Sequence, residues 1–214
     1  KSQLRGYGIL LAREGFVCLC TSYRLSEEEK WPAQIQDVKC AVRYIRANAD
    51  LLNIDPNRIG ISGNSAGGHL SLMAGLREYS PKFEGEAGNN DVNSSVKAVC
   101  AIYPPAQIRK YENTDPINDA YKTLMGVEAP QEEYDLASPL LQIRDDFPPT
   151  MLIHGSTDSV VNLSDTTDLY KILVDLNIPA ELHIYSEEEH AFDSQSGYGR
   201  SVADLQALFF QKYL

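Results

Sequence analysis

The sequence lacks several features that would place it in other classes of protein. Its 214 residues contain no run of 18 apolar residues, so no membrane-spanning helix is expected. Basic residues are few, with 19 lysines and arginines against 30 aspartates and glutamates, which argues against a nucleic-acid partner. No glycine loop ending in Lys-Ser/Thr and no His-Glu-x-x-His motif occurs, so neither a cofactor nor a metal ion is predicted.

Cysteine pairs with metal or redox spacing are also missing. The four cysteines form no Cys-x-x-Cys pair: Cys18, Cys20, Cys40 and Cys100. We interpret them as thiols that pack as small apolar side chains, which fits a reducing compartment such as the cytoplasm. The length and the apolar content of 43% suit one domain with a substantial core.

Helical and strand patterns alternate along this chain. Apolar residues recur at helical spacing in residues 4–15, 32–45, 66–79, 163–177 and 202–213. Short apolar runs between them predict strands over residues 16–20, 58–62, 96–103, 150–154 and 181–185. The alternation predicts one α/β domain over residues 1–214, with a mostly parallel sheet covered by helices on both faces. Residues 80–95 are interpreted as a loop, and residues 106–148 as an inserted cap or lid.

A Gly-x-Ser-x-Gly motif provides the first candidate for chemistry. The residues Gly63-Asn64-Ser65-Ala66-Gly67 directly follow a predicted strand and open a predicted helix. A sharp strand-to-helix turn exposes the serine hydroxyl at a helix N-terminus, where N–H groups favour negative charge. Glycines are expected on both flanks because side chains there would collide. We predict that Ser65 is a nucleophile and that the Ala66 N–H contributes to an oxyanion hole.

A serine nucleophile needs a base, and the base needs an orienting carboxylate. The strand over 150–154 runs into Asp158, and the strand over 181–185 runs into His190. Both residues therefore lie beyond the carboxyl ends of strands, where reactive groups of parallel sheets gather. The order serine, aspartate, histidine is the one that such a serine turn requires. We predict that His190 takes the Ser65 proton while Asp158 accepts the Nδ1 proton of His190.

Structural roles explain the other candidate groups. The remaining histidines fall inside predicted helices or strands: His69, His154 and His183. Capping explains the two acids that lie within or at the start of a helix, Asp165 and Asp168. Asp193 follows His190 too closely to serve easily as its partner. The acidic run Glu187, Glu188 and Glu189 either forms a solvated loop or raises the His190 pKa through its negative charge.

These motifs, taken in order, resemble esterases of the hormone-sensitive-lipase and carbohydrate-acetylesterase branch of the α/β-hydrolases. The similar stretches are residues 32–37, 53–59, 63–70, 137–140, 149–158 and 190–192. The resemblance spans nearly the whole chain, and it implies hydrolysis of carboxylic esters through an acyl-enzyme without a cofactor. It assigns Ser65, Asp158 and His190 the same three roles. Kynurenine formamidases and prolyl-oligopeptidase-like peptidases share much of the pattern, so an amide hydrolase is the alternative.

Two parts of the family pattern are missing. A His-Gly-Gly-Gly segment normally precedes the first helix and supplies oxyanion-hole donors, whereas this chain begins at Lys1, just after that point. The family's sheet runs 1-2-4-3-5-6-7-8, and residues 16–20 correspond to the fourth strand, so the third strand is absent. The chain is a fragment, another chain supplies the strand, or residues 16–20 pair directly with their new neighbour. Because an unpaired edge favours association, we predict a homodimer or a larger assembly.

The expected partner is a small-molecule ester. Nothing in the sequence selects between a sugar acetate, an aliphatic ester and an aryl ester. Candidate substrate contacts are Asn64, Tyr103 and Val161, and the other aromatic residues considered for a pocket are Trp31, Tyr111 and Tyr121. The missing oxyanion segment leaves a third hypothesis open, a noncatalytic remnant that binds partners.

Overall fold

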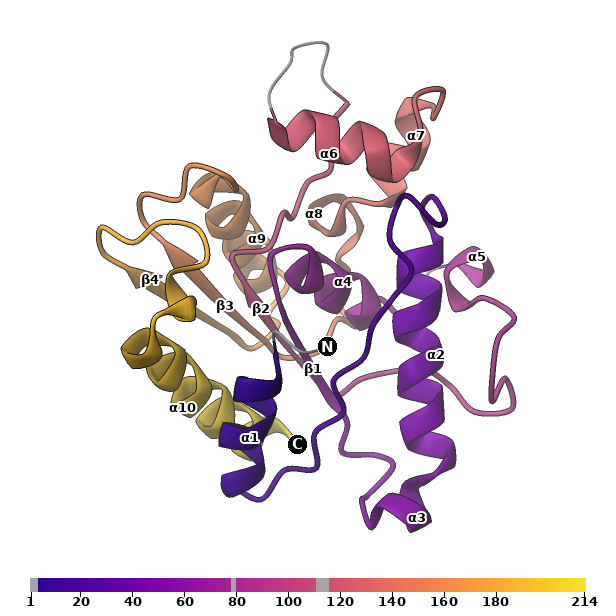
Figure 1. The fold of residues 1–214 in the computed structure, drawn as a ribbon, viewed down its shortest axis with the longest axis vertical. Helices are drawn as coiled ribbons and strands as arrows, with labels where there is room; N and C mark the ends of the chain where they lie inside the picture. The colour runs from indigo at the N-terminus through magenta and orange to yellow at the C-terminus, as the bar shows by residue number, and fades with distance from the viewer. Residues whose placement is uncertain (1–3, 78–79, 111–115) are drawn as a thin grey trace.

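The computed structural model describes residues 4–77, 80–110 and 116–214, and its strands form one parallel sheet within those ranges. The sheet order is β1 (Gly60–Asn64), β2 (Ala98–Ile102), β3 (Thr150–Gly155) and β4 (Ala180–Tyr185), as Figure 1 shows. The register aligns Ser62 with Cys100, and Cys100 with Met151. Because all four strands run the same way, the residues that follow them meet at one edge of the sheet.

The two central strands are buried along their whole length because helices cover both faces of the sheet. On one face, Cys100 and Ile102 pack with Phe209 of α10 (Ser196–Tyr213), beside which α1 (Arg5–Arg13) lies. On the other face, Val99 and Ala101 belong to a core shared with α2 (Ala33–Ala47), α4 (Ala66–Gly75) and α9 (Leu163–Asp175). Alternation of side chains along β2 explains why neighbours point to opposite cores. No helix in the described ranges combines the length and apolar character needed to cross a membrane.

The predicted elements are mostly present, with shifted ends. The strand before the serine is Gly60–Asn64 rather than 58–62, and the last helix begins at Ser196 rather than at residue 202. The helix after the serine ends at Gly75 because Leu76 takes an extended conformation. The predicted loop over 80–95 contains the short helix α5 (Pro81–Glu84).

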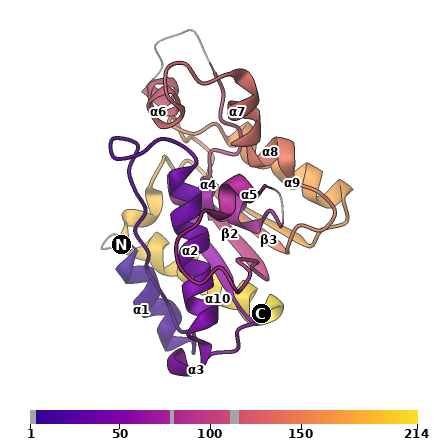
Figure 2. The same ribbon diagram turned by 90° about the vertical axis from the view of Figure 1, so that its right-hand side faces the viewer.

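The segment over residues 106–148 is more helical than expected. It contains α6 (Pro116–Met125), α7 (Gln131–Leu136) and α8 (Pro139–Gln142). Figures 1 and 2 show α6 and α7 together at one end of the molecule, away from α3 (Ala49–Leu52). Tyr134 of α7 is fully buried in the core that α2 and α4 share. The segment thus packs on the domain's own core, and its role as a lid remains a prediction.

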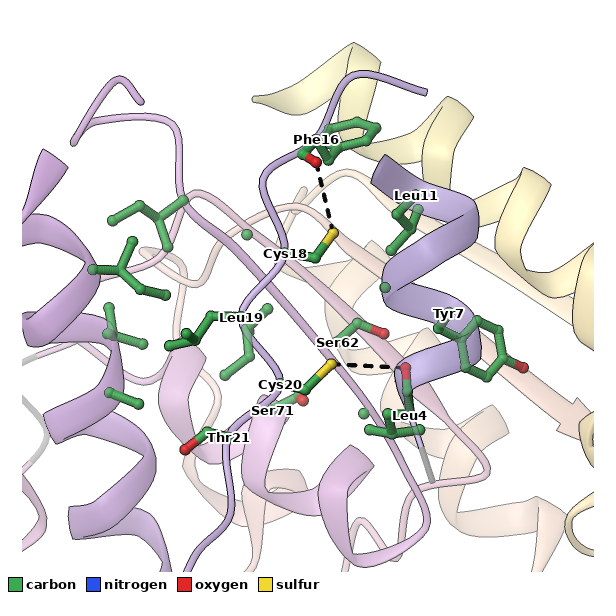
Figure 3. Close-up of a pocket in the computed structure, with 18 of the residues that line it drawn as sticks. Leu4, Tyr7, Leu11, Phe16, Cys18, Leu19, Cys20, Thr21, Ser62 and Ser71 are labelled. Atoms are coloured by element: carbon green, nitrogen blue, oxygen red, sulfur yellow. Dashed lines mark hydrogen bonds between the residues drawn. The ribbon is translucent and has the colours of Figure 1, made fainter. Parts of the chain in front are cut away.

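The prediction of a strand over residues 16–20 is wrong. These residues adopt no strand, and β1 pairs only with β2 among the described strands. A cavity of about 260 Å³ lies between residues 16–21 and β1, also lined by α1 and α2 (Figure 3). The chain is anchored elsewhere at the start of this segment and just after its end. The ring centroid of Phe16 lies 6.2 Å from that of Phe210, and the Arg24 backbone N–H donates to Asp37 Oδ2 at 2.8 Å. Direct pairing with β1, one of the three explanations for the absent strand, is therefore also wrong.

The open edge carries the prediction of self-association. Val17 is 60% exposed and Leu19 48% exposed beside this cavity. Leu19 lies on the segment beside the open edge of β1, and because a charge near an exposed sheet edge opposes edge-to-edge pairing, Leu19→Lys should shift the chain toward the monomer. Small-angle scattering over a range of concentrations measures this, with Val127→Lys as the control because Val127 is 79% exposed between α6 and α7. A parent chain that is monomeric and monodisperse throughout would contradict the prediction.

Candidate active site

The nucleophile candidate Ser65 lies in the turn between β1 and α4. Its φ of 53° and ψ of −120° are strained for a residue with a side chain. The Ser65 N–H donates to the Ile102 carbonyl at 2.9 Å, which holds the turn against β2. A Cβ on Gly63 would lie 2.3 Å from the Gly67 carbonyl oxygen, whereas a Cβ on Gly67 would meet nothing within 4 Å. The expectation that both flanking glycines prevent a collision is therefore right for Gly63 and wrong for Gly67.

The structure brings Ser65, Asp158 and His190 together. His190 Nε2 lies 2.9 Å from Ser65 Oγ, and His190 Nδ1 lies 2.7 Å from Asp158 Oδ2. Both distances are those of ordinary hydrogen bonds. Asp158 follows β3 and His190 follows β4, so neighbouring parallel strands deliver the two side chains to the same edge. Residues 125 positions apart in the sequence thus share a hydrogen bond.

The Asp158 carboxylate is enclosed by hydrogen-bond donors. Its side chain has no exposed surface, and Oδ1 accepts from the N–H groups of Val160 and Val161 at 2.9 and 2.8 Å. Oδ2 faces His154 Nε2 at 3.2 Å as well as His190. Burial by itself raises the pKa of this carboxyl, but the bonds from His154, His190 and the two N–H groups outweigh it. The net result is a pKa well below the ordinary value, so Asp158 is charged at neutral pH.

His154 belongs to the site, which the sequence interpretation missed. Its ring is fully buried, and Nε2 faces two acceptors, Asp158 Oδ2 at 3.2 Å and the Val161 carbonyl at 3.1 Å. Nε2 therefore carries a proton, and Nδ1 lies 2.8 Å from the Thr166 hydroxyl oxygen. The end of a buried strand indicated a hydrogen-bonded core histidine, which is correct. Its contact with Asp158, only four residues later, was missed because the prediction paired Asp158 with His190 alone.

The acidic run before His190 ties the loop of the base to the loop of the acid. Glu189 accepts from the Ser159 N–H at 3.0 Å and from the Ser159 hydroxyl at 2.9 Å, and these bonds lower the Glu189 pKa. The Glu187 N–H donates to the Ser156 hydroxyl at 2.8 Å. The run thus connects the two loops, a role that neither sequence interpretation anticipated.

The predicted substrate contacts have other partners in the structure. The Asn64 amide and the Tyr103 hydroxyl both donate to Asp193. Val161 is 2% exposed, and its N–H serves Asp158. Ala66 is an exposed residue that opens α4, where N–H groups lack helical acceptors. Contact of Asn64, Tyr103 and Val161 with a substrate stays a prediction, as does the oxyanion role of Ala66.

His69 joins the helix after the serine to the segment over 106–148. Its Nε2 lies 2.7 Å from the Ala137 carbonyl oxygen, and its ring lies 5.4 Å from that of Trp31. Burial lowers the His69 pKa to about 4, although the bond to Ala137 acts in the opposite direction. Two of the aromatic residues considered for a pocket, Trp31 and Tyr121, are each 7% exposed in the core. Tyr111 lies outside the described residues.

The buried His69 should make the fold sensitive to mild acid. Unfolded chain binds a proton at this side chain near pH 6.5, but the folded chain does so only near pH 4, so stability falls as pH decreases through that window. His69→Gln should remove about 2 to 3 kcal/mol of the stability difference between pH 7 and pH 4.5. Urea unfolding at both pH values measures it, with the partly exposed His183→Gln as control. An equal loss of stability in parent and His69→Gln would contradict the assignment.

The fold and this site together define the class of the protein. Helices on both faces of a parallel sheet, with a strained serine turn after one strand and Asp158 and His190 after two others, are the arrangement of the α/β-hydrolase class. Within the described ranges, no group of three or more His, Cys, Asp or Glu side chains is placed to hold a metal ion. The chain belongs to the BD-FAE family, whose model matches residues 3–173.

Curated relatives are longer than this chain. Esterase LipC of Mycobacterium tuberculosis (strain ATCC 25618 / H37Rv) is 34% identical over 167 residues, which cover 74% of this chain and 41% of LipC. The probable carboxylic ester hydrolase LipM of the same strain is 31% identical over 191 residues, covering 86% of this chain and 43% of LipM. The chain therefore spans less than half the length of these two relatives. The similarity confirms the predicted resemblance to esterases.

Solved structures agree on the fold. A truncated form of a carbohydrate esterase from gut microbiota superposes with a TM-score of 0.83 and 32% identity, covering 96% of this chain and 78% of that one. An acetyl ester-xyloside bifunctional hydrolase from Caldicellulosiruptor lactoaceticus gives 0.82 and 28%, with coverage of 95% and 74%. These matches confirm the predicted α/β-hydrolase fold.

Proposed function

We propose that this chain hydrolyses carboxylic esters through an acyl-enzyme formed on Ser65. The observation that carries the proposal is the 2.9 Å contact between Ser65 Oγ and His190 Nε2, with His190 held by Asp158 at 2.7 Å. A serine hydroxyl is a weak nucleophile at neutral pH unless a base of this kind takes its proton. LipC and LipM, which match most of this chain, support the same reaction class.

In the proposed reaction, Ser65 Oγ attacks the ester carbonyl carbon as His190 takes its proton. Asp158 stabilises the imidazolium, which then donates the proton to the departing alcohol. Water hydrolyses the acyl-enzyme in the second half, again with His190 as the base. The oxyanion lies at the start of α4, where we propose the Ala66 N–H as one donor. Loss of a single donor typically lowers turnover by about 10²–10³-fold, so full activity requires a second donor.

The proposed substrates carry short or medium acyl groups, and acetylated carbohydrates are the first candidates. The carbohydrate esterase and the acetyl ester-xyloside hydrolase among the similar structures support this class. We also propose that residues 106–148 form a cap over the site. They begin four residues after the end of β2, and the chain leaves β2 at the edge of the sheet where Asp158 and His190 lie.

A fluorophosphonate probe tests the proposal because it bonds covalently to an activated serine. The parent chain should take one label, at Ser65, and Ser65→Ala should take none. Ser62→Ala is the matched control, since Ser62 lies in β1 and its hydroxyl donates to Gln206 at 2.6 Å. A parent chain that is neither labelled nor active would overturn the proposal in favour of a noncatalytic role.

Substrate comparison separates ester from amide hydrolysis. The parent should cleave acetylated xylo-oligosaccharides and p-nitrophenyl acetate faster than N-formylkynurenine or a proline peptide. Ester bonds have the better leaving group, so only a site shaped for the amide would reverse the order. A higher kcat/KM on N-formylkynurenine or on the peptide would overturn ester hydrolysis as the function.

A further inference from the structure

Several segments of the chain converge on Asp193, next to the candidate triad. Asp193 lies in the 3₁₀ helix η1 (Phe192–Ser194), directly after the loop that carries His190, and it is 9% exposed. Its Oδ2 accepts from the Tyr7 hydroxyl of α1 at 2.5 Å and from the Asn64 amide. Its Oδ1 accepts from the Tyr103 hydroxyl, to which the Asn64 amide also donates at 2.9 Å. Both carboxylate oxygens thus accept from neutral donors.

Two of these donors are adjacent to the reacting groups. Asn64 directly precedes Ser65 in the strained turn. Tyr103 directly follows Ile102, whose carbonyl accepts the Ser65 N–H at 2.9 Å. The Tyr103 ring lies 4.6 Å from the His190 ring, at an interplanar angle of 58°. A chain of contacts therefore runs from Asp193 to both the nucleophile and the base.

The Tyr103 backbone is strained, which indicates that its ring is held in a required place. Its φ is 37°, a value that residues with side chains rarely adopt. Its N–H donates to the Ile153 carbonyl at 2.6 Å, and its hydroxyl is held at the other end by Asp193. Strain of this kind persists only where the surroundings enforce it, and it concentrates at functional sites.

We propose that Asp193 is a positioning residue that acts through Tyr103 and Asn64, a role that rests on the proposed esterase function. Anchored by Asp193, the Tyr103 ring limits rotation of the His190 imidazole and keeps Nε2 directed at Ser65 Oγ. Asn64, held at the same carboxylate, fixes the turn from the nucleophile's side. Asp193 itself touches no reacting atom.

Removal of single hydroxyl or carboxylate groups tests this role. Tyr103→Phe keeps the ring but loses the anchor, and Asp193→Asn weakens all three contacts. Each variant should lower kcat by about 10- to 100-fold with little change in KM, because small displacements of reacting groups cost this much. Tyr185→Phe is the control: its ring packs 4.7 Å from that of Phe192, but its hydroxyl lies 2.9 Å from Ser201 Oγ. It should retain the parent kcat.

A second readout does not depend on activity. The His190 Nδ1 proton, hydrogen-bonded to Asp158, should give a downfield NMR resonance that is absent in His190→Ala. Tyr103→Phe and Asp193→Asn should shift or broaden it, while Tyr185→Phe leaves it unchanged. If the parent cleaves no ester but the resonance responds, the esterase function fails and the positioning role stands. If both variants keep the parent resonance and the parent kcat and lose only thermal stability, the positioning role is overturned.

Discussion

Replacement of Ser65 or His190 by alanine should lower kcat for p-nitrophenyl acetate by about 10⁴- to 10⁶-fold, and replacement of both should cost little more. The two side chains act as one unit, since Nε2 at 2.9 Å from Oγ is useful only while both atoms are present. Asp158→Asn should cost about 10⁴-fold, because the amide cannot orient and stabilise the charged imidazole in the same way. Steady-state rates on p-nitrophenyl acetate, measured for the three single variants and for the double variant, test these expectations.

Folding controls are needed because the three side chains also contact one another. Circular dichroism and urea unfolding should show Ser65→Ala as stable as the parent. The backbone at position 65 has a φ of 53°, and alanine bears the same conformational cost there as serine does. Ser62→Ala should keep the parent rate. Multiplicative losses in the double variant, or full activity in His190→Ala, would contradict a shared proton-transfer unit.

The two glycines of the serine motif should respond to alanine in opposite ways. Gly63→Ala places a Cβ 2.3 Å from the Gly67 carbonyl oxygen, so the turn must open. We expect a loss of about 3 kcal/mol of stability and at least about 10²-fold in kcat, because backbone cannot yield as a flexible side chain does. Gly67→Ala meets nothing within 4 Å and lies within α4, so it should raise stability by up to about 1 kcal/mol.

Urea unfolding and fluorophosphonate labelling distinguish the two glycine variants. Labelling of Ser65 should be slow or absent in Gly63→Ala and should persist in Gly67→Ala. A destabilised Gly67→Ala would mean that position 67 has a further contact, and an active Gly63→Ala would mean that the turn relaxes at little cost.

The sequence was most informative where chemistry depends on short local patterns. The serine turn needs only a strand, a glycine and a helix start within a few residues, so Ser65 was recognisable from neighbours alone. Asp158 and His190 were predicted because each follows a strand, and parallel strands place such residues at one edge. The structure brings them within hydrogen-bonding distance of each other and of Ser65.

Residues that act through long-range packing were not predicted. Asp193 was set aside because it follows His190 closely, a criterion that concerns only the His190 ring. Its partners Tyr7, Asn64 and Tyr103 lie far away in the sequence and on different elements. No local pattern encodes these pairs. His154 is a different case: it was assigned to the core, yet it lies only four residues before Asp158, and the two side chains meet because the chain turns after Gly155.

The residue pattern by itself determined the α/β class, the four strands of the sheet and the three candidate triad residues, because periodicity and strand-end position are local properties of the chain. Tertiary structure alone decided that residues 16–20 stay apart from β1, that Gly63 but not Gly67 is sterically required, and that Asp193 reaches both sides of the triad. Each of these depends on distances between segments that meet only after the sheet and its helices have packed, which no single stretch of sequence specifies.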